Sequence, residues 1–328
     1  MPTPLHSSIS PASIRRSLLE AGAIAVGYAD AKGVEPSAID AYKQWLDRGN
    51  HAGMAYMERH GELRADPRGL LPEARSVIAC AFPFAPASED DIAPGRIAAY
   101  AYGLDYHDVL RGRLQKAIRK IDPSSEAEWR ICIDSAPIPE RYWAQKAGIG
   151  FIGRNGAIII PGHGSMVFIA LILTSLTLPA SSPIYEKCLG CRRCLEACPG
   201  KAIADDGTVD SRRCLSYLTI EHRGPWISPE ALSTVSTPAG RQCLFGCDIC
   251  LRVCPHNRQI PSTTIAEFYP LPTLKDLVEE TGGPEKLQNR CLTMTQEEFS
   301  RLFKGSPIKR AKLAGLHRNA STGNLDRF

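Results

Sequence analysis

Nine of the twelve cysteines lie between residues 188 and 254, and their spacing is typical of a metal centre. The stretch CLGCRRCLEACPG (188–200) places four of them two, two and three residues apart, with Pro199 directly after the last. A second stretch, CDICLRVCP (247–255), also ends in a Cys-Pro pair. Runs of this kind hold 4Fe–4S clusters in bacterial ferredoxins, where the last cysteine of a run ligates the other cluster. The sequence therefore predicts two 4Fe–4S clusters.

The exchange of ligands between the two runs assigns most of the thiolates. Three cysteines on one tight loop reach three irons of a single cube, and the next helical turn carries the fourth toward the other cube. One cluster is then held by Cys188, Cys191, Cys194 and Cys254. The other takes Cys198, Cys247, Cys250 and either Cys214 or Cys243. A zinc site is the alternative, but structural zinc usually closes with two separated pairs of ligands. The lone Cys80, Cys132 and Cys291 fall in apolar contexts and are expected to be core thiols.

Composition indicates a globular chain in a reducing compartment. The 328 residues are 44% hydrophobic and 23% charged, which is ordinary for a soluble protein. The longest apolar run (166–178) has 13 residues, whereas a bilayer span needs about 20. We see no secretory signal, and clustered thiols without one favour metal binding in the cytoplasm. Residues 301–328 hold seven Lys or Arg against one Asp, so the basic character of the chain lies in its C-terminal end.

The pattern of apolar residues predicts three regions. Strands are expected in 76–84 and 129–137, and helices in 108–121 and 140–149. The segments 156–161 and 165–173 are expected to form a strand pair. We therefore predict an α/β domain over 1–180, a ferredoxin-like two-cluster domain over 181–262 and a short helical, basic region over 263–328. In the last region Thr295 and Glu298 have the spacing of a capping box.

A nucleotide site is not indicated. The stretch GIGFIGRNG (148–156) is rich in glycine, but it precedes an expected strand instead of joining a strand to a helix. No GxxxxGK[ST] motif occurs. A chain with about 180 residues ahead of its clusters is also far longer than a simple ferredoxin needs. The clusters are therefore expected to deliver electrons to chemistry in the N-terminal domain.

Several longer stretches identify a family. YGLDYHDVLRGRL (102–114), IDSAPIPER (133–141) and KAGIGFIGRNG (146–156), with RRCLSYLTIE (212–221) and FKGSPIKRAKLAGLHRN (303–319), resemble epoxyqueuosine reductase over nearly the whole chain. The resemblance implies an enzyme that reduces epoxyqueuosine to queuosine in tRNA, using cobalamin and two 4Fe–4S clusters. It implies base-off cobalamin in the N-terminal domain, Cys214 as the ambiguous ligand of the second cluster, a low-potential external electron donor and a monomer.

The resemblance also implies roles for individual residues. Asp134 is expected to be the proton donor, with a pKa raised by an apolar wall; the alternative is an Asx turn that caps the strand end. DYHDVL (105–110) lacks the glycine of the DxHxxG motif, so His107 is not assigned as a cobalt ligand. Secondary candidates for base contacts or proton supply are Tyr102, Asp105, Tyr106 and His107. Candidate cobalamin contacts are Met57, Arg141, Asn155, Ser165 and Ser216.

A tRNA substrate requires cations that neutralise phosphates. The predicted contacts are Lys309, Arg310, Lys312 and Arg318, and Lys201, Arg212, Arg213 and Arg223 extend the same surface. The alternative for such a run is a solvated helix face. Two other functions remain open from the residues alone: a corrinoid iron–sulfur reductase of a small molecule, and a two-cluster electron-transfer subunit.

Overall fold

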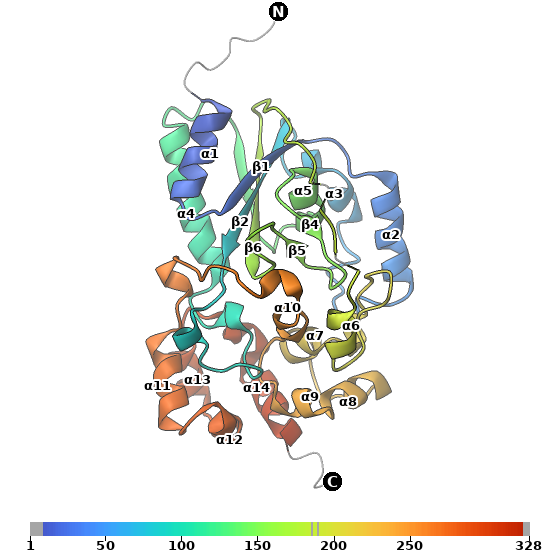
Figure 1. Cartoon of the computed structure of the whole chain (residues 1–328), viewed down its shortest axis with the longest axis vertical. Coiled ribbons are helices and arrows are strands. Elements are labelled where there is room, and N and C mark those ends of the chain that lie inside the picture. The colour runs from blue at the N-terminus through green and yellow to red at the C-terminus, as the bar shows by residue number, and fades with distance from the viewer. Residues whose placement is uncertain (1–8, 185, 189, 324–328) are drawn as a thin grey trace, which may run out of the picture.

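A computed structural model describes residues 9–184, 186–188 and 190–323. In Figure 1 a sheet with its flanking helices forms the upper part of the molecule, and short helices form the lower part. The strands are β1 (Ala25–Asp30), β2 (Ser76–Pro83), β3 (Trp129–Cys132), β4 (Phe151–Ile152), β5 (Ile158–Ile159) and β6 (Val167–Thr174). The helices of the upper part are α1 (Pro11–Glu20), α2 (Pro36–Asp47), α3 (Gly61–Ala65), α4 (Tyr106–Ile121) and α5 (Glu140–Lys146).

The lower part consists of short helices. They are α6 (Arg193–Ala197), α7 (Leu215–Ile220), α8 (Pro229–Val235), α9 (Pro238–Gln242), α10 (Ile249–Arg252), α11 (Pro272–Glu280), α12 (Leu287–Leu292), α13 (Gln296–Leu302) and α14 (Lys312–Ser321). Single 3₁₀ turns occur at η1 (Pro67–Gly69), η2 (Ser88–Asp90), η3 (Ala99–Ala101), η4 (Ser211–Arg213), η5 (Pro255–Asn257), η6 (Ala266–Phe268), η7 (Pro284–Lys286) and η8 (Pro307–Ala311). Among the described residues no helix is both long and apolar enough to cross a membrane.

The main sheet has four strands in the order β1-β2-β6-β3, and every neighbouring pair is antiparallel. The central strand β2 is buried along its whole length, because helices cover both faces. Ile78, Cys80 and Phe82 point toward α1 and α4, whereas Val77, Ala79 and Ala81 pack on the side of α5. This alternation explains why β2 reads as a continuous apolar run.

The close packing of β1 against α5 depends on one glycine. A Cβ at Gly27 would lie 1.9 Å from the carbonyl oxygen of Ala147, which follows α5. No larger residue fits there without moving backbone, so Gly27 fixes how closely α5 approaches the sheet. Since α5 begins at Glu140, this contact also determines where the loop after β3 ends.

Most predicted elements are confirmed, and two expectations are corrected. Helices α4 and α5, strands β2 and β3 and the Thr295–Glu298 capping box lie where the pattern predicted them. The N-terminal region is a mixed helix and strand domain, but its sheet is antiparallel, so it lacks the parallel crossovers that an α/β label implies. The expected pairing of 156–161 with 165–173 is wrong: Ile160 forms an isolated bridge with Gly164, in the link between the two segments. Instead β5 pairs with β4, and β6 enters the main sheet because it is apolar on both faces.

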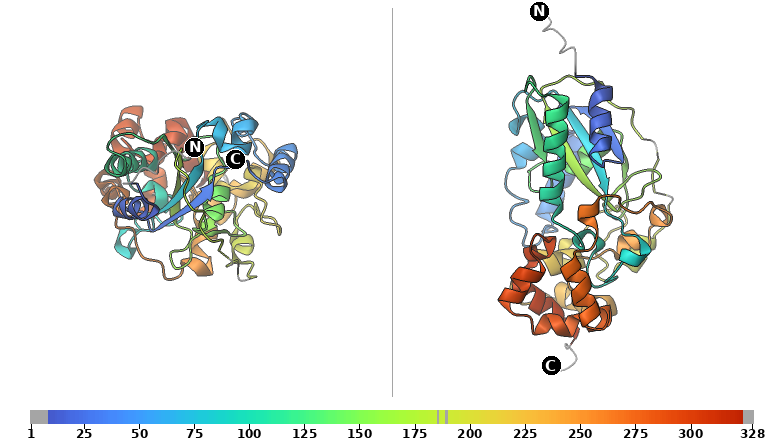
Figure 2. Two further views of the ribbon diagram at one scale, coloured as in Figure 1. Left: turned by 90° about the horizontal axis from the view of Figure 1, so that it is seen from above. Right: turned by 90° about the vertical axis from the view of Figure 1, so that its left-hand side faces the viewer.

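The three predicted regions share one core. Phe245, between the cysteine runs, forms a bridge with Ile97, and the carbonyl of Phe245 accepts a bond from the N–H of Ala98 at 2.8 Å. Phe268 and Ile308 from the C-terminal region join the same hydrophobic cluster as β2 and α4. The cysteine-bearing and C-terminal segments are thereby packed against the lower end of the sheet (Figure 2).

Candidate active site and metal centre

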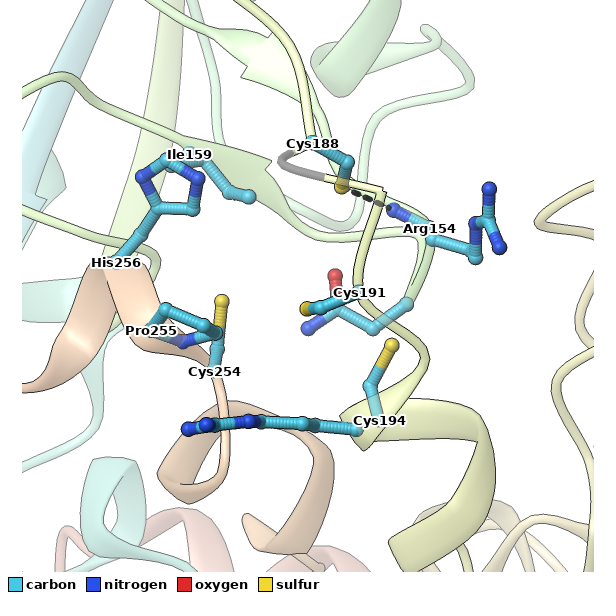
Figure 3. A pocket seen from close by; sticks show the side chains of 10 residues that line it. Arg154, Ile159, Cys188, Cys191, Cys194, Cys254, Pro255 and His256 are labelled. Carbon is cyan, nitrogen blue, oxygen red and sulfur yellow. Dashed lines mark hydrogen bonds between the residues drawn. The ribbon is translucent and has the colours of Figure 1, made fainter.

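The first group of cysteines surrounds a pocket beside α6. It is lined by Cys188, Cys191, Cys194 and Cys254, together with Arg154, Asn155, Ile159, Arg193, Pro255 and His256 (Figure 3). The first three thiols come from the loop before α6 and its first turn, and Cys254 precedes η5. The backbone N–H of Arg154 donates to the Sγ atom of Cys188 at 3.2 Å. The structure therefore brings together the four thiols that were predicted for one cluster.

The chemistry of this pocket suits a 4Fe–4S cube. Four thiols converge on it from two segments, and an N–H group already points at a sulfur. The buried Nε2 atom of His256 has no hydrogen-bond partner among the described residues, so it is available to a group in the pocket. No three described His, Cys, Asp or Glu side chains gather tightly enough for a single metal ion; the thiols are spread around the pocket. Hydrogen bonds to sulfur are a usual means of stabilising such clusters.

The second group of cysteines comes from three segments: Cys198 follows α6, Cys214 precedes α7, and Cys247 and Cys250 lie just before and at the start of α10. Burial, together with the neighbouring Cys214 and Cys198, raises the pKa of the Cys247 thiol to about 12. Burial likewise raises the pKa of Cys250, which faces the same three thiols. Cys243 is also close, but its thiol donates to the carbonyl oxygen of Gly246 at 2.7 Å. Cys198, Cys214, Cys247 and Cys250 thus lie within electrostatic range of one another, and the Cys243 thiol is bonded to the backbone.

Cys80, Cys132 and Cys291 are buried, as expected of core thiols, although the Cys132 thiol also lies within electrostatic range of Arg130 and Glu140.

The segment of the second cysteine group touches an aromatic cluster. A Cβ on Gly246 would lie 2.6 Å from the Cβ of Ala98 and 3.5 Å from the ring of Tyr100, and its φ is +70°. The Oδ2 atom of Asp248 accepts the N–H of Ala99 at 2.6 Å. The Tyr100 ring then lies 6.1 Å from that of Tyr106. This cysteine group is therefore next to the residues that surround Asp134.

Asp134 lies in a sharp turn after β3. Its φ is +52°, and the N–H of Ser135 bonds back to the carbonyl of Ile133. The carboxylate is 62% exposed and points toward the start of α4. There its Oδ2 atom accepts the hydroxyl of Tyr106 at 2.8 Å and lies 3.3 Å from Nε2 of His107. The side chain is therefore bound to these two residues, and the alternative of an Asx turn is wrong.

His107 connects two carboxylates. Asp105 is the N-cap of α4, and its Oδ1 atom accepts the backbone N–H of His107 at 3.0 Å. The same oxygen lies 2.7 Å from Nδ1 of the His107 ring, while Nε2 faces Asp134. The Tyr106 ring stacks between His107 and Phe168, with centroids 4.2 and 4.3 Å away. The start of α4 thus builds a series of linked side chains, Asp105–His107–Asp134.

The charges of these three side chains correct the expectation that the pKa of Asp134 is raised. The protein around the Asp134 carboxylate removes part of its hydration and acts to raise its pKa, but hydrogen bonds from His107 and Tyr106 outweigh this effect and the pKa is lowered. Burial lowers the pKa of His107, yet hydrogen bonds to Asp105 and Asp134 dominate and raise it to about 9. The predicted apolar wall is replaced by two donors. At neutral pH the proton therefore resides on His107 and Asp134 is ionised.

Several residues near Asp134 were missed at the level of sequence. Glu140 accepts the backbone N–H of Asp134, and burial with the Asp134 charge raises the pKa of Glu140 to about 8. Tyr56 and Tyr100 lie within electrostatic range of Asp134. In the sequence, Glu140 lies within IDSAPIPER and Tyr100 stands two residues before YGLDYHDVL, two of the stretches that carry the family resemblance. Apart from that position, no pattern pointed to either residue. Tyr56 directly precedes Met57, a predicted cobalamin contact, but was not itself predicted.

Tyr102 is not at this site. It is fully buried, and its hydroxyl donates to Asp91 at 2.9 Å and accepts the N–H of Ala93. Asp91 in turn pairs with Arg252 at 2.7 Å. Of the four secondary candidates, the structure brings Asp105, Tyr106 and His107 close to Asp134. Tyr102 lies in the core instead, because the Tyr102 ring faces inward from the end of η3.

The predicted cobalamin contacts are dispersed. Arg141 donates to the carbonyl of Gly156, and Asn155 lines the pocket of the first cysteine group. Ser165 is buried and is bound through its N–H and hydroxyl to Asn257 at 2.7 and 2.9 Å. Met57 and Ser216 are half-buried, one after Tyr56 and one after the Cys214 segment. Among these five described candidates, Met57 and Ser216 are the two whose side chains are not hydrogen-bonded to a distant segment; the Met57 sulfur makes a 3.8 Å contact with Nη2 of Arg64.

The predicted phosphate contacts divide into two groups. Lys309 and Lys312 are exposed. Arg310 donates to both oxygens of Glu221 at 3.0 and 2.8 Å and also influences Asp134, so it lies at the edge of the active site.

Arg318 has a structural role instead. Its guanidinium donates to the carbonyls of Leu218, His222 and Gly224, with the ring of Trp226 4.9 Å away. Burial lowers its pKa to about 10. These bonds fix the loop after α7, so the expectation that Arg318 contacts phosphate is not supported by its position. Asp326 and Arg327, which entered the charge count, lie outside the described residues.

The four basic residues that were predicted to extend the phosphate-binding surface are bonded within the protein. Arg212 pairs with Asp210, and Arg213 donates to the carbonyl of Gly200. Arg223 donates to the carbonyl of Arg310 at 2.9 Å, and Lys201 to that of Glu196 at the same distance. Lys201, Arg212 and Arg213 therefore stabilise the cysteine-bearing part, whereas Arg223 joins the loop after α7 to η8.

Comparison with known proteins gives a consistent result. Residues 64–135 match the family "Epoxyqueuosine reductase QueG, DUF1730", and residues 187–257 match the "4Fe-4S double cluster binding domain". The epoxyqueuosine reductase of Leadbetterella byssophila is 38% identical over 278 residues, covering 84% of this chain and 86% of that protein. That of Salmonella typhimurium is 36% identical over 319 residues, covering 94% and 78%.

Solved structures agree with the sequence comparison. A crystal structure of epoxyqueuosine reductase with an epoxyqueuosine-modified tRNA-Tyr stem loop superposes with a TM-score of 0.81 at 27% identity. It covers 95% of this chain, and this chain covers 80% of it. The Bacillus subtilis enzyme, whose catalytic aspartate loop is described as swung out of the active site, has a TM-score of 0.80 at the same identity and coverage.

Proposed function

The chain belongs to the epoxyqueuosine reductase family, and we propose that it reduces epoxyqueuosine in tRNA to queuosine. The reaction takes up two electrons and two protons and releases the epoxide oxygen as water. The observation that carries the proposal is the exposed Asp134 carboxylate, bonded to Tyr106 and His107 beside a cysteine-rich electron path. An oxidoreductase of this family needs both parts: an acid at the epoxide and a route for single electrons.

Two 4Fe–4S clusters and cobalamin are the cofactors of the proposed reaction. We assign Cys188, Cys191, Cys194 and Cys254 to one cluster, because these thiols line one pocket. The other is assigned to Cys198, Cys214, Cys247 and Cys250, which influence one another's pKa. Cys243 is left out because its thiol is bonded to a carbonyl. The second cluster would then lie next to Tyr100.

Cobalamin fits the exposed side of Asp134. The side chains there come from distant parts of the chain and offer hydroxyl, carboxylate and guanidinium groups suited to an amide-fringed ring: Tyr56, Tyr100, Glu221 and Arg310. When bound, cobalamin supplies a strongly reducing cobalt centre at the end of the electron path. Met57 and Ser216 are the original candidates that this placement retains. Arg141, Asn155 and Ser165 remain weaker candidates, since each is held by a structural bond.

The chain's own residues move the proton. Breaking a C–O bond of the epoxide builds negative charge on oxygen, and a positioned acid commonly accelerates such a step 10²- to 10⁴-fold. Asp134 is the residue whose carboxylate is exposed to substrate. Because Asp134 is ionised at rest, His107 first passes the proton from Nε2 to Oδ2 of Asp134. Asp105 stabilises the charged ring through Nδ1, and Tyr106 keeps the Asp134 oxygen oriented.

The remaining features of the proposal concern partners and layout. Lys309, Arg310 and Lys312 lie near the edge of the site, where the backbone of a tRNA anticodon loop would pass. An external low-potential donor would reduce the clusters one electron at a time. We retain the division into 1–180, 181–262 and 263–328, a cytoplasmic location and a monomer as parts of this proposal; the shared hydrophobic cluster means that the three regions fold together.

The test is direct. The protein is reconstituted without oxygen with iron, sulfide and cobalamin, and incubated with epoxyqueuosine-containing tRNA and a chemical reductant. Nucleosides from digested tRNA are then analysed by mass spectrometry. The proposal predicts conversion to a product lighter by one oxygen, in wild type and not in Asp134→Asn. Loaded protein that leaves the nucleoside unchanged would refute it.

A further inference from the structure

We propose that Glu140 is a positioning residue that holds the Asp134 loop in its active geometry. The inference rests on the proposed function, because Asp134 is the group being positioned. Glu140 was not among the predicted site residues. Its carboxylate accepts the backbone N–H of Asp134, six residues earlier in the chain.

The loop between β3 and α5 needs such a tie. Asp134 has a positive φ of +52°, and the N–H of Ser135 bonds to the carbonyl of Ile133 across it. A three-residue turn with a positive central φ is rare and strained for a residue with a side chain. Pro137 and Pro139 have no N–H to contribute. The bond from the Asp134 N–H to Glu140 therefore fastens the strained residue itself.

Glu140 is a rigid point of attachment. It is the first residue of α5, where Trp143 and Ala144 are buried against the sheet. The distance between β1 and α5 is in turn fixed by Gly27. The tie thus connects the active-site loop to a helix that is closely packed against the sheet. If it is removed, the strained φ can relax, and the Asp134 carboxylate then leaves Tyr106 and His107.

The groups facing Glu140 are consistent with this role. They come from the loop, α4, α5 and the end of β3: Asp134, Tyr106, His107, Arg141 and Cys132. Burial and the Asp134 charge disfavour an ionised Glu140. A neutral carboxyl still accepts the N–H through its carbonyl oxygen, and so does an amide. A glutamine in this position is therefore expected to preserve the tie, and an alanine to remove it.

The experiment compares Glu140→Ala with Glu140→Gln in the fully loaded enzyme. In single-turnover reduction of epoxyqueuosine-containing tRNA we expect Glu140→Ala to lose about 10- to 100-fold in rate, the usual effect of a misplaced reactive group. The KM for tRNA is expected to stay within about threefold, because substrate contacts remain. Glu140→Gln should recover most of the rate. Glu297→Ala, an exposed acidic residue in the first turn of α13, is the matched control.

A second readout does not depend on turnover. Hydrogen exchange of the peptide covering 130–136, followed by mass spectrometry, reports the protection of the Asp134 amide. Glu140→Ala should exchange faster there, and Glu140→Gln should resemble wild type, with cluster absorption unchanged in both. Equal defects in the two variants, or normal rate and protection in Glu140→Ala, would overturn the inference. If wild type fails to reduce the tRNA, the proposed function fails, whereas the exchange comparison still tests the tie.

Discussion

Replacing Asp134 by asparagine is expected to change the titration of His107 as well as the chemistry. The Nε2 atom of His107 lies 3.3 Å from Oδ2 of Asp134, and Nδ1 lies 2.7 Å from Asp105. The variant keeps the shape of the side chain and removes one of the two negative charges that stabilise the imidazolium. His107 is 31% exposed, so solvent only partly screens this interaction.

The magnitude follows from these contacts. Although burial lowers the pKa of His107, the two carboxylates raise it from its ordinary 6.5 to about 9. Each pKa unit corresponds to 1.36 kcal/mol, so the protonated ring contributes up to about 3 kcal/mol to folding. A raised pKa means that the folded chain binds the proton more tightly than the unfolded chain. The contribution is therefore complete below pH 6.5 and is lost as the pH rises through about 9. Removing one opposite charge shifts a pKa by about 1–3 units, so in Asp134→Asn the pKa of His107 should fall by at least about 1 unit.

The assay is an NMR titration of the oxidised holoprotein with ¹³C-labelled histidine. His107→Gln identifies the resonance among the eight histidines. We expect wild-type His107 to titrate near pH 9 and the Asp134→Asn variant to titrate clearly lower, with the other histidines unchanged. The proposed proton position is refuted if wild-type His107 titrates at 6.5 or below, or if its pKa is the same in the variant.

Three other outcomes are expected. Asp134→Asn should retain the cobalamin and iron–sulfur absorption of wild type and lose turnover, because its amide cannot deliver the proton; near-normal turnover would remove Asp134 from the mechanism. Cys214→Ala should bind about four irons where wild type binds about eight, while Cys243→Ala should keep about eight; the reverse pattern would exchange their roles. Arg318→Met should lower the thermal midpoint, because it removes three hydrogen bonds to carbonyls and a cation–π contact, whereas Lys312→Ala should leave the midpoint unchanged and reduce the salt dependence of tRNA binding by about one phosphate contact. Equal effects of the last two substitutions on the midpoint would contradict the structural role of Arg318.

Local chemistry was readable from the sequence. Cysteine spacing and the two Cys-Pro endings predicted the exchange of ligands between runs, because loop and helix geometry determine which thiols can face one cube. The helices α4 and α5 and the capping box at Thr295 were likewise predicted, since caps and apolar periodicity act over a few residues. The family resemblance indicated Asp134. It also included the stretch YGLDYHDVL, which contains His107, the histidine that the structure places beside Asp134.

Tertiary structure alone decided the electrostatic state of the site and the topology of the sheet. Asp134 has a lowered pKa because α4 brings Tyr106 and His107 to it from 27 or 28 residues away, a contact that no local pattern encodes. Arg318 looks like any other cation of a basic run, and only its burial over Trp226 shows that its donors are occupied. The order β1-β2-β6-β3 and its antiparallel pairing were also decided by the tertiary structure, because β2 and β6 are buried along most of their length and their apolar sequences do not indicate which strand pairs with which. Spacing along the chain determines which groups meet within a turn or a loop, whereas distant segments meet through burial, and burial then decides which of those groups carry charge.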